Sequence, residues 1–272
     1  MQLGIGSHTF TWAVGVANNP PPRPLTVEDL LDRAVELGVS VVQYCDNLPL
    51  DRLSTEARCR LARAAREAGI KIEVGTRGIE AEHLRRYLAI AQQFASPILR
   101  LVIDTAQHHL DPDEIVARLR ALLPEFEAAG VVLAIENHDR FRAATLAAIL
   151  ERVDSSHIGI CLDTVNSFGA LEGPDVVLDA LGPWVVNLHV KEFVVRRASH
   201  NMGFVVEGLP AGQGMLDLPW LLGRLRQLGR DPNAILEQWT PPELDLAATI
   251  AKEAAWAVES IAYLRRLIPL AA

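Results

Sequence analysis

The sequence predicts an α/β protein built as a single (β/α)8 TIM barrel over residues 1–272, and three observations support this prediction. Eight short apolar runs, rich in β-branched residues, recur along the chain. Their starts are 27 to 36 residues apart, except for one interval of 48 residues before the last run. Helix-like stretches lie between most of them. Apolar strands that show little alternation and that alternate with helices are typical of a closed parallel sheet.

The elements follow from these patterns in order. The predicted strands are the apolar runs 3–9, 39–45, 70–76, 98–104, 131–137, 158–164, 185–191 and 233–239. Predicted helices, with apolar residues at i, i+3, i+4 and i+7, include 27–38, 54–69, 81–94 and 111–130. Polar starts such as Ser54 and Asp111, and glycine stops such as Gly38 and Gly130, support the boundaries. An open doubly wound sheet is the alternative, but the glycine cluster at 208–214 lacks the GxGxxG pattern.

Composition excludes several classes of function. The net charge of −8 argues against nucleic-acid or anionic-membrane binding as the main role, because both need a basic surface. Residues 1–10 do not resemble a signal peptide, and no apolar segment approaches the roughly 20 residues that span a bilayer. The three cysteines lack CxxC spacing and are expected to be free thiols in a reducing compartment. We therefore expect a cytoplasmic protein.

Four residues of the types that bind metal ions lie at the ends of four successive predicted strands. Glu136 closes VVLAIEN, Asp163 closes IGICLDT, His189 lies in VVNLHVK and Glu237 in NAILEQW. Such groups are excluded from apolar surroundings unless they are paired or bound to a cation. In a barrel these strand ends meet on the catalytic face. Three carboxylates and one imidazole favour Mn²⁺, Mg²⁺ or Co²⁺ over structural Zn²⁺, although buried ion pairs are the alternative for each residue.

Several motifs resemble those of the xylose isomerase-like TIM barrel superfamily, which contains sugar isomerases and epimerases related to endonuclease IV. The motifs are AIENH (134–138), CLDT (161–164), NLHVKE (187–192), the G-x-G-x-x-D stretch 212–217 and ILEQW (235–239). The resemblance implies one divalent cation, Mn²⁺ or Mg²⁺, bound by residues matching Glu136, Asp163, His189 and Glu237. It also implies that the two glutamates flank the reacting carbon of a sugar and move protons between its faces.

The chemistry of these residues agrees with that implication. Isomerising or epimerising a ketose removes a proton next to a carbonyl and stabilises the resulting enediolate. A metal ion supplies the electrostatic stabilisation, and a carboxylate supplies the base. Glu136 and Glu237 are therefore the candidate catalytic residues as well as ligands, and Asp163 and His189 are mainly ligands.

The chain departs from the ketose 3-epimerases of this superfamily at three places. They carry a second glutamate six residues after the ligand of the fifth strand, where this chain has Arg142. They carry a histidine where this chain has Asn166, and an arginine where it has Val195 followed by Arg196. A trinuclear endonuclease IV site is also not expected, because residues 202–204 supply neither of the two additional ligands that such a site needs there.

Five further residues are candidate substrate contacts. The set comprises His138, Asn166, Lys191, Arg196 and His200. Lys191 follows His189 by two positions, so in a strand both point to the same face. The segment 196–214 creates the long interval before the last strand, and we expect it to be a loop that covers the barrel mouth.

The sequence thus predicts a metal-dependent isomerase or epimerase that acts on a sugar or keto-polyol. The alternative is a dehydratase or other lyase at the same site, similar to inosose dehydratase, and the losses at Arg142 and Asn166 favour it. A sugar-binding barrel without turnover is a third class, with no evident use for two carboxylates on a metal. The resemblance also implies a possible homo-oligomer, either a dimer or a tetramer.

Overall fold

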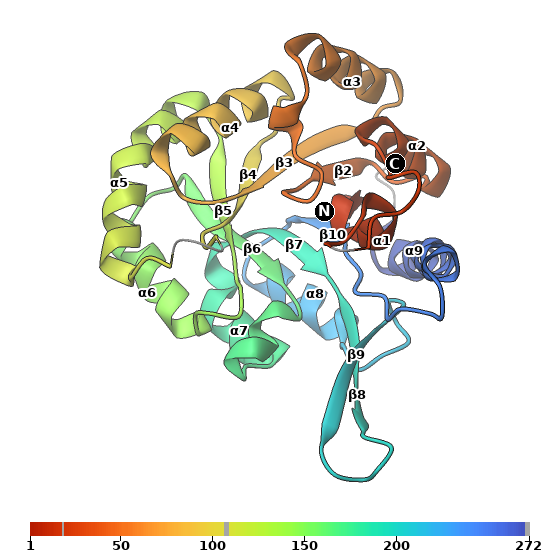
Figure 1. Cartoon of the computed structure of the whole chain (residues 1–272). Coiled ribbons are helices and arrows are strands. Elements are labelled where there is room, and N and C mark those ends of the chain that lie inside the picture. The colour runs from red at the N-terminus through yellow and green to blue at the C-terminus, as the bar shows by residue number, and fades with distance from the viewer. Residues whose placement is uncertain (18, 106–108, 270–272) are drawn as a thin grey trace.

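A closed barrel of eight parallel strands forms the centre of the molecule in this computed structural model, which describes residues 1–17, 19–105 and 109–269 (Figure 1). The order around the barrel is β1-β10-β7-β6-β5-β4-β3-β2. The strands are β1 (Leu3–Gly6), β2 (Val41–Tyr44), β3 (Lys71–Arg77), β4 (Ile98–Val102), β5 (Val132–Glu136), β6 (Ile158–Asp163), β7 (Val185–Val190) and β10 (Asn233–Leu236). The predicted (β/α)8 barrel is confirmed.

Helices surround the barrel (Figure 1). They are α1 (Thr11–Val14), α2 (Val27–Leu37), α3 (Thr55–Glu67), α4 (Ala81–Gln93), α5 (Pro112–Ala129), α6 (Ala143–Val153), α7 (Pro174–Leu181), α8 (Leu218–Gln227) and α9 (Leu246–Leu267), with short 3-10 turns at 7–10, 50–52, 166–170 and 182–184. The expected capping signals hold for α5: the Asp111 side chain accepts from Glu114 N, and Gly130 ends the helix at a φ of 66°. Among the described residues, no helix has the length and apolar character needed to cross a membrane.

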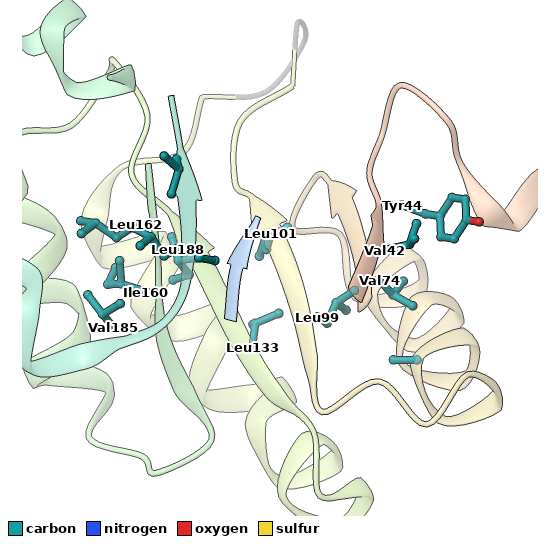
Figure 2. Close-up of a cluster of buried hydrophobic side chains, with 14 of the residues drawn as sticks. Val42, Tyr44, Val74, Leu99, Leu101, Leu133, Ile160, Leu162, Val185 and Leu188 are labelled. Carbon is teal, nitrogen blue, oxygen red and sulfur yellow. The ribbon is translucent and has the colours of Figure 1, made fainter. Parts of the chain in front are cut away.

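Alternate residues of the strands face two different environments. Figure 2 shows apolar side chains from several strands of the barrel, such as Val42, Val74, Leu99 and Leu188, which belong to one buried cluster with apolar residues of the helices. Because side chains alternate along a strand, the residues next to them point into the barrel. Those inward positions of β2, β3, β4 and β7 hold polar groups, namely Gln43, Glu73, Arg100, Asn187 and His189, all buried. The barrel interior therefore carries the polar chemistry of the protein.

The long interval before the last barrel strand contains a β-hairpin and not the loop predicted over 196–214, although Val206, Glu207 and Gly208 of this segment do line a pocket at the barrel. Strands β8 (Glu192–Arg197) and β9 (Phe204–Leu209) pair antiparallel, with Val195 opposite Val206. The hairpin projects away from the barrel (Figure 1). Valines and Phe204 on both sides of a short connection favour strand pairing, which explains the difference.

Helix α9 is tied to the segment after β1 by a buried carboxylate. Glu253 accepts hydrogen bonds from the backbone N–H groups of Trp12 at 2.9 Å and Ala13 at 3.1 Å, and it is fully buried. Burial raises the pKa of Glu253 to about 7, although these backbone donors oppose the rise. The folded protein therefore holds a proton on Glu253 more tightly than the unfolded chain does.

This shift predicts a pH-dependent term in stability. A carboxyl with a raised pKa contributes stability that is fully present below its unfolded pKa of about 4.5 and is lost as the pH rises through about 7. Between pH 6 and pH 8.5 we expect this term to lower the free energy of unfolding by about 1 kcal/mol. Urea unfolding at both pH values should show this difference in the native protein and a smaller one in Glu253→Gln. Equal pH dependence in the two proteins would contradict the assignment.

Candidate metal centre and substrate pocket

The carboxyl ends of β5, β6, β7 and β10 bring the four predicted ligands together. Glu136 and Asp163 end their strands, His189 pairs with Asp163 in register, and Glu237 directly follows β10. His189 Nδ1 lies 3.3 Å from Glu136 Oε2, 3.3 Å from Glu237 Oε1 and 3.8 Å from Asp163 Oδ2. All four side chains are buried. The four strand ends therefore place one imidazole nitrogen among three carboxylates.

Unpaired polar atoms show that this cluster fits a cation. Among the described residues, His189 Nδ1 and Glu237 Oε1 are buried without a hydrogen-bond partner. Ligand atoms of Asp163, His189 and Glu237 lie within 4.8 Å of one another, and Glu136 forms a second such group with His189 and Cys161. Buried polar atoms without partners are costly. A divalent ion with a preference for oxygen and imidazole ligands would satisfy them.

Asp163 is fixed so that one of its oxygens faces the cluster. Its Oδ1 accepts from the backbone N–H groups of Val165 and Asn166, each at 2.9 Å. The side-chain oxygen of Asn137 accepts from the Asp163 backbone N–H at 2.7 Å. These contacts orient Asp163 Oδ2 toward His189.

Lys191 adds a positive charge beside the cluster. Its Nζ lies 2.7 Å from Asp163 Oδ2 and 3.0 Å from Glu237 Oε2. Burial lowers the pKa of Lys191, but Asp163 and Glu237 outweigh that effect and raise the pKa above its usual value. The side chain therefore remains an ammonium group.

Glu136 is held from both sides by side chains of other strands. Arg100 Nε donates to Glu136 Oε2, and Asn166 Nδ2 donates to Glu136 Oε1 at 2.7 Å. Burial favours the protonated acid, yet the charges of Arg100 and His189 hold the pKa of Glu136 well below its usual value. Both oxygens of this carboxylate thus already accept a hydrogen bond.

The charge on Arg100 is shared with a second carboxylate, that of Asp46. Arg100 Nη1 lies 2.7 Å from Asp46 Oδ1, and Arg77 Nε lies 3.0 Å from Asp46 Oδ2. Burial raises the pKa of Asp46, but the imidazole of His8, 3.8 Å away, and the charge of Arg100 outweigh it and lower the pKa. Asp46 therefore anchors Arg100 in place under Glu136.

A pocket of about 760 Å³ opens next to the cluster, within the size range of small-molecule sites. Lys191 and Asn166 connect its lining to the metal cluster. Three of the five predicted substrate contacts line the pocket, namely His138, Asn166 and Lys191. Its apolar walls include Trp12, Phe168, Val206 and Trp239. The cluster and the pocket thus form one continuous candidate site.

The chain is similar in sequence to proteins of a known barrel family. The family model described as "Xylose isomerase-like TIM barrel" matches residues 31–267. The chain belongs to the xylose isomerase-like TIM barrel family. It is 34% identical over 271 residues to a protein from Pectobacterium atrosepticum named 3-oxo-isoapionate decarboxylase, covering 100% of this chain and 98% of that one.

Solved structures of xylose isomerase-like barrels share the fold. D-psicose 3-epimerase from Clostridium cellulolyticum H10, solved with D-tagatose, has a TM-score of 0.71 at 17% identity, covering 98% of this chain and 99% of that one. A xylose isomerase-like protein from Mycobacterium smegmatis, solved in complex with magnesium, has a TM-score of 0.67 at 16% identity, covering 96% and 97%. The chain is therefore an enzyme of the xylose isomerase-like superfamily, whose members named here include both an epimerase and a decarboxylase.

Arg100 of this xylose isomerase-like chain is a site residue that was not predicted from the sequence. The residue stands in the apolar run ILRLVID, flanked by Leu99 and Leu101. A charged side chain inside a strand that is otherwise apolar is the signal that could have identified it, because such a group needs a buried partner. Which carboxylate it meets depends on the closure of the barrel and is not visible in the spacing.

The structure places Arg196 and His200 apart from the pocket of this xylose isomerase-like barrel. Arg196 is exposed in β8 and lies 3.8 Å from Glu207 Oε2, and His200 is exposed in the connection of the hairpin. Neither lines the pocket. A role in substrate binding stays a prediction for both, and the pocket gives it no support. Arg142, at the position of the epimerase glutamate, directly precedes α6.

Proposed function

We propose that this chain is a divalent metal-dependent decarboxylase, a lyase that acts on a 3-oxo sugar acid. The relative that is 34% identical over the full chain is named for such a reaction. This relative favours a lyase, predicted above as the alternative, over the isomerase or epimerase predicted first.

This proposal rests on the hydrogen bonds that both oxygens of Glu136 already accept. Epimerisation needs two bases, one on each face of the reacting carbon, and both oxygens of Glu136 are occupied by Arg100 and Asn166. Its lowered pKa also makes it a weak base. Loss of CO2 from a 3-oxo acid removes no proton from carbon, so it does not need a second base.

Glu136, Asp163, His189 and Glu237 would hold the cation, with Mn²⁺ or Mg²⁺ expected and Co²⁺ also compatible. When bound, such an ion supplies a Lewis acid for the oxygen of the substrate carbonyl. In the reaction the bond between the carboxyl carbon and its neighbour breaks, and the electron pair moves toward the carbonyl to give an enolate. A proton then adds to the carbon that lost CO2, so that atoms and charge balance.

The residues of the chain support this reaction in distinct ways. The Lys191 ammonium places positive charge where negative charge develops on the enolate. His138 lines the pocket and can donate a hydrogen bond to a substrate hydroxyl or carbonyl. Trp12 and Trp239 provide apolar walls, and a carboxylate that leaves as neutral CO2 gains from low polarity around it.

The reaction is tested by product analysis with protein stripped of metal and reloaded with Mn²⁺. With 3-oxo-isoapionate or another 3-oxo sugar acid in D₂O, we expect stoichiometric CO2 and one solvent deuterium at the carbon that carried the carboxylate. Chelator should abolish both. Deuterium exchange and epimer formation with ketoses that lack a carboxylate, without CO2 from any 3-oxo acid, would overturn the decarboxylase and support the epimerase.

A further inference from the structure

A group of buried polar side chains lies below the metal cluster in the barrel interior. We call Gln43, Glu73, Asn187 and Asn233 the Gln43–Glu73 network. His189 Nε2 lies 2.6 Å from Gln43 Oε1, and Gln43 Nε2 donates to Glu73 Oε2 at 3.1 Å. Glu73 also accepts from Asn187 Nδ2 at 2.9 Å and from Asn233 Nδ2 at 2.8 Å. The far side of the imidazole is thus linked to a carboxylate with three amide donors.

The contacts of the network determine which way each amide points. The backbone N–H of Gln2 donates to Asn233 Oδ1 at 3.1 Å, so the nitrogen of that amide must face Glu73. Because the Glu73 carboxylate only accepts, the amide nitrogens of Gln43 and Asn187 face it, and Asn187 Oδ1 in turn accepts from Gln43 Nε2 at 3.0 Å. The thiols of Cys45 and Cys161, each 3.3 Å from an amide oxygen, fit the same orientation as donors. The oxygen of Gln43 therefore faces His189.

This direction decides which tautomer the neutral imidazole adopts. An oxygen can only accept, so His189 Nε2 must carry the hydrogen that it shares with Gln43. In the neutral ring Nδ1 then keeps its lone pair, and Nδ1 is the atom among the three carboxylates. A neutral imidazole with this tautomer is a metal ligand.

We propose that Glu73 is a positioning residue, which sets the direction of the Gln43 amide and thereby the His189 tautomer that binds the metal. The inference rests on the proposed metal centre and deepens it. Glu73 touches neither the candidate ligands nor the pocket in any described contact, and it acts through Gln43.

The energetics of burial support this role. A carboxylate inside a barrel is costly, and an apolar side chain of similar volume is often at least as stable. Burial raises the pKa of Glu73, while the hydrogen bonds from Asn233, Gln43 and Asn187 oppose the rise. Three donors that converge on one buried carboxylate suit a group that must orient its neighbours.

Glu73→Gln tests the proposal with metal affinity as the readout. A carboxamide at this position both donates and accepts, so the Gln43 amide loses its preferred direction. We expect Mn²⁺ affinity, measured by titration with electron paramagnetic resonance, to fall about 10- to 100-fold, the usual effect of losing such a supporting contact. Glu253→Gln is the matched control, since it also removes a buried carboxylate; its Mn²⁺ affinity should equal that of the native protein.

A charge-conserving exchange separates orientation from packing. Glu73→Gln combined with Gln43→Glu returns an acceptor-only group to His189 Nε2, so we expect Mn²⁺ affinity within about threefold of the native protein. This double variant also decides the matter where the single variant does not fold. Native affinity in Glu73→Gln, or a loss in the double variant as large as in the single one, would overturn the proposal. Native protein that binds no Mn²⁺ would instead overturn the proposed function itself.

Discussion

Glu237→Gln is expected to lose activity by at least about a hundredfold and to lose Mn²⁺ affinity in parallel. The substitution keeps size and hydrogen bonding but removes one of the three negative charges around His189 Nδ1. Burial opposes ionisation, yet His189 and Lys191 lower the pKa of Glu237 to about 2, so the native group is fully charged at neutral pH. Removing one charged group at a preorganised site costs about 10²- to 10³-fold in rate.

Activity and Mn²⁺ binding should be measured on the same preparations. Glu67→Gln on the exposed side of α3 is the matched control and should behave like the native protein. Full activity together with native metal affinity in Glu237→Gln would show that the cluster is not the metal site.

Arg100→Leu should lower the free energy of unfolding by about 3 to 5 kcal/mol. The guanidinium is buried between Glu136 and Asp46, and its loss leaves the buried Glu136 carboxylate without its cation. Breaking a buried pair by removing one partner is costly for this reason. Chemical unfolding in the presence of chelator measures the effect without a contribution from bound metal.

A second substitution tests the cause of that loss. Asp46→Asn, added to Arg100→Leu, removes one of the two carboxylates that lost a partner, so part of the stability should return. A loss below about 1 kcal/mol in the single variant, or no recovery in the double variant, would show that the pairing contributes little.

The convergence of the four strand ends could be predicted because it depends on a rule of the fold. Parallel strands of a barrel end on one face, so Glu136, Asp163, His189 and Glu237 meet wherever the strand assignment is right. The sequence signal is strong because each residue closes an apolar run, where an unpaired charge is excluded. Their convergence is confirmed by the structure, and their role as ligands stays a proposal.

Contacts across the barrel interior could not be predicted in the same way. Arg100 reaches Glu136 and Asp46, and Gln43 reaches Glu73 and His189, through pairings set by barrel closure and side-chain length. A pattern of alternating residues shows that a side chain points inward but not which partner it meets. The hairpin β8–β9 was missed for a related reason, since its pairing depends on a connection of six residues without a strong turn motif.

The contacts of Glu136 also show why motif similarity alone does not determine the reaction. The chain shares its fold with a solved epimerase structure and is 34% identical to a relative named as a decarboxylase. In this chain Arg100 and Asn166 each donate to Glu136, so both oxygens of that carboxylate already have a partner. We propose that such side chains around the candidate ligands determine which reaction the site catalyses.

Anomalous diffraction from a crystal soaked in Mn²⁺ tests the four-residue metal centre most directly. We predict one strong peak at the manganese edge, within coordinating distance of His189 Nδ1 and of carboxylate oxygens of Glu136, Asp163 and Glu237. Native protein that shows no peak there at saturating Mn²⁺, or a peak bound by other residues, would contradict the metal centre and the decarboxylation built on it.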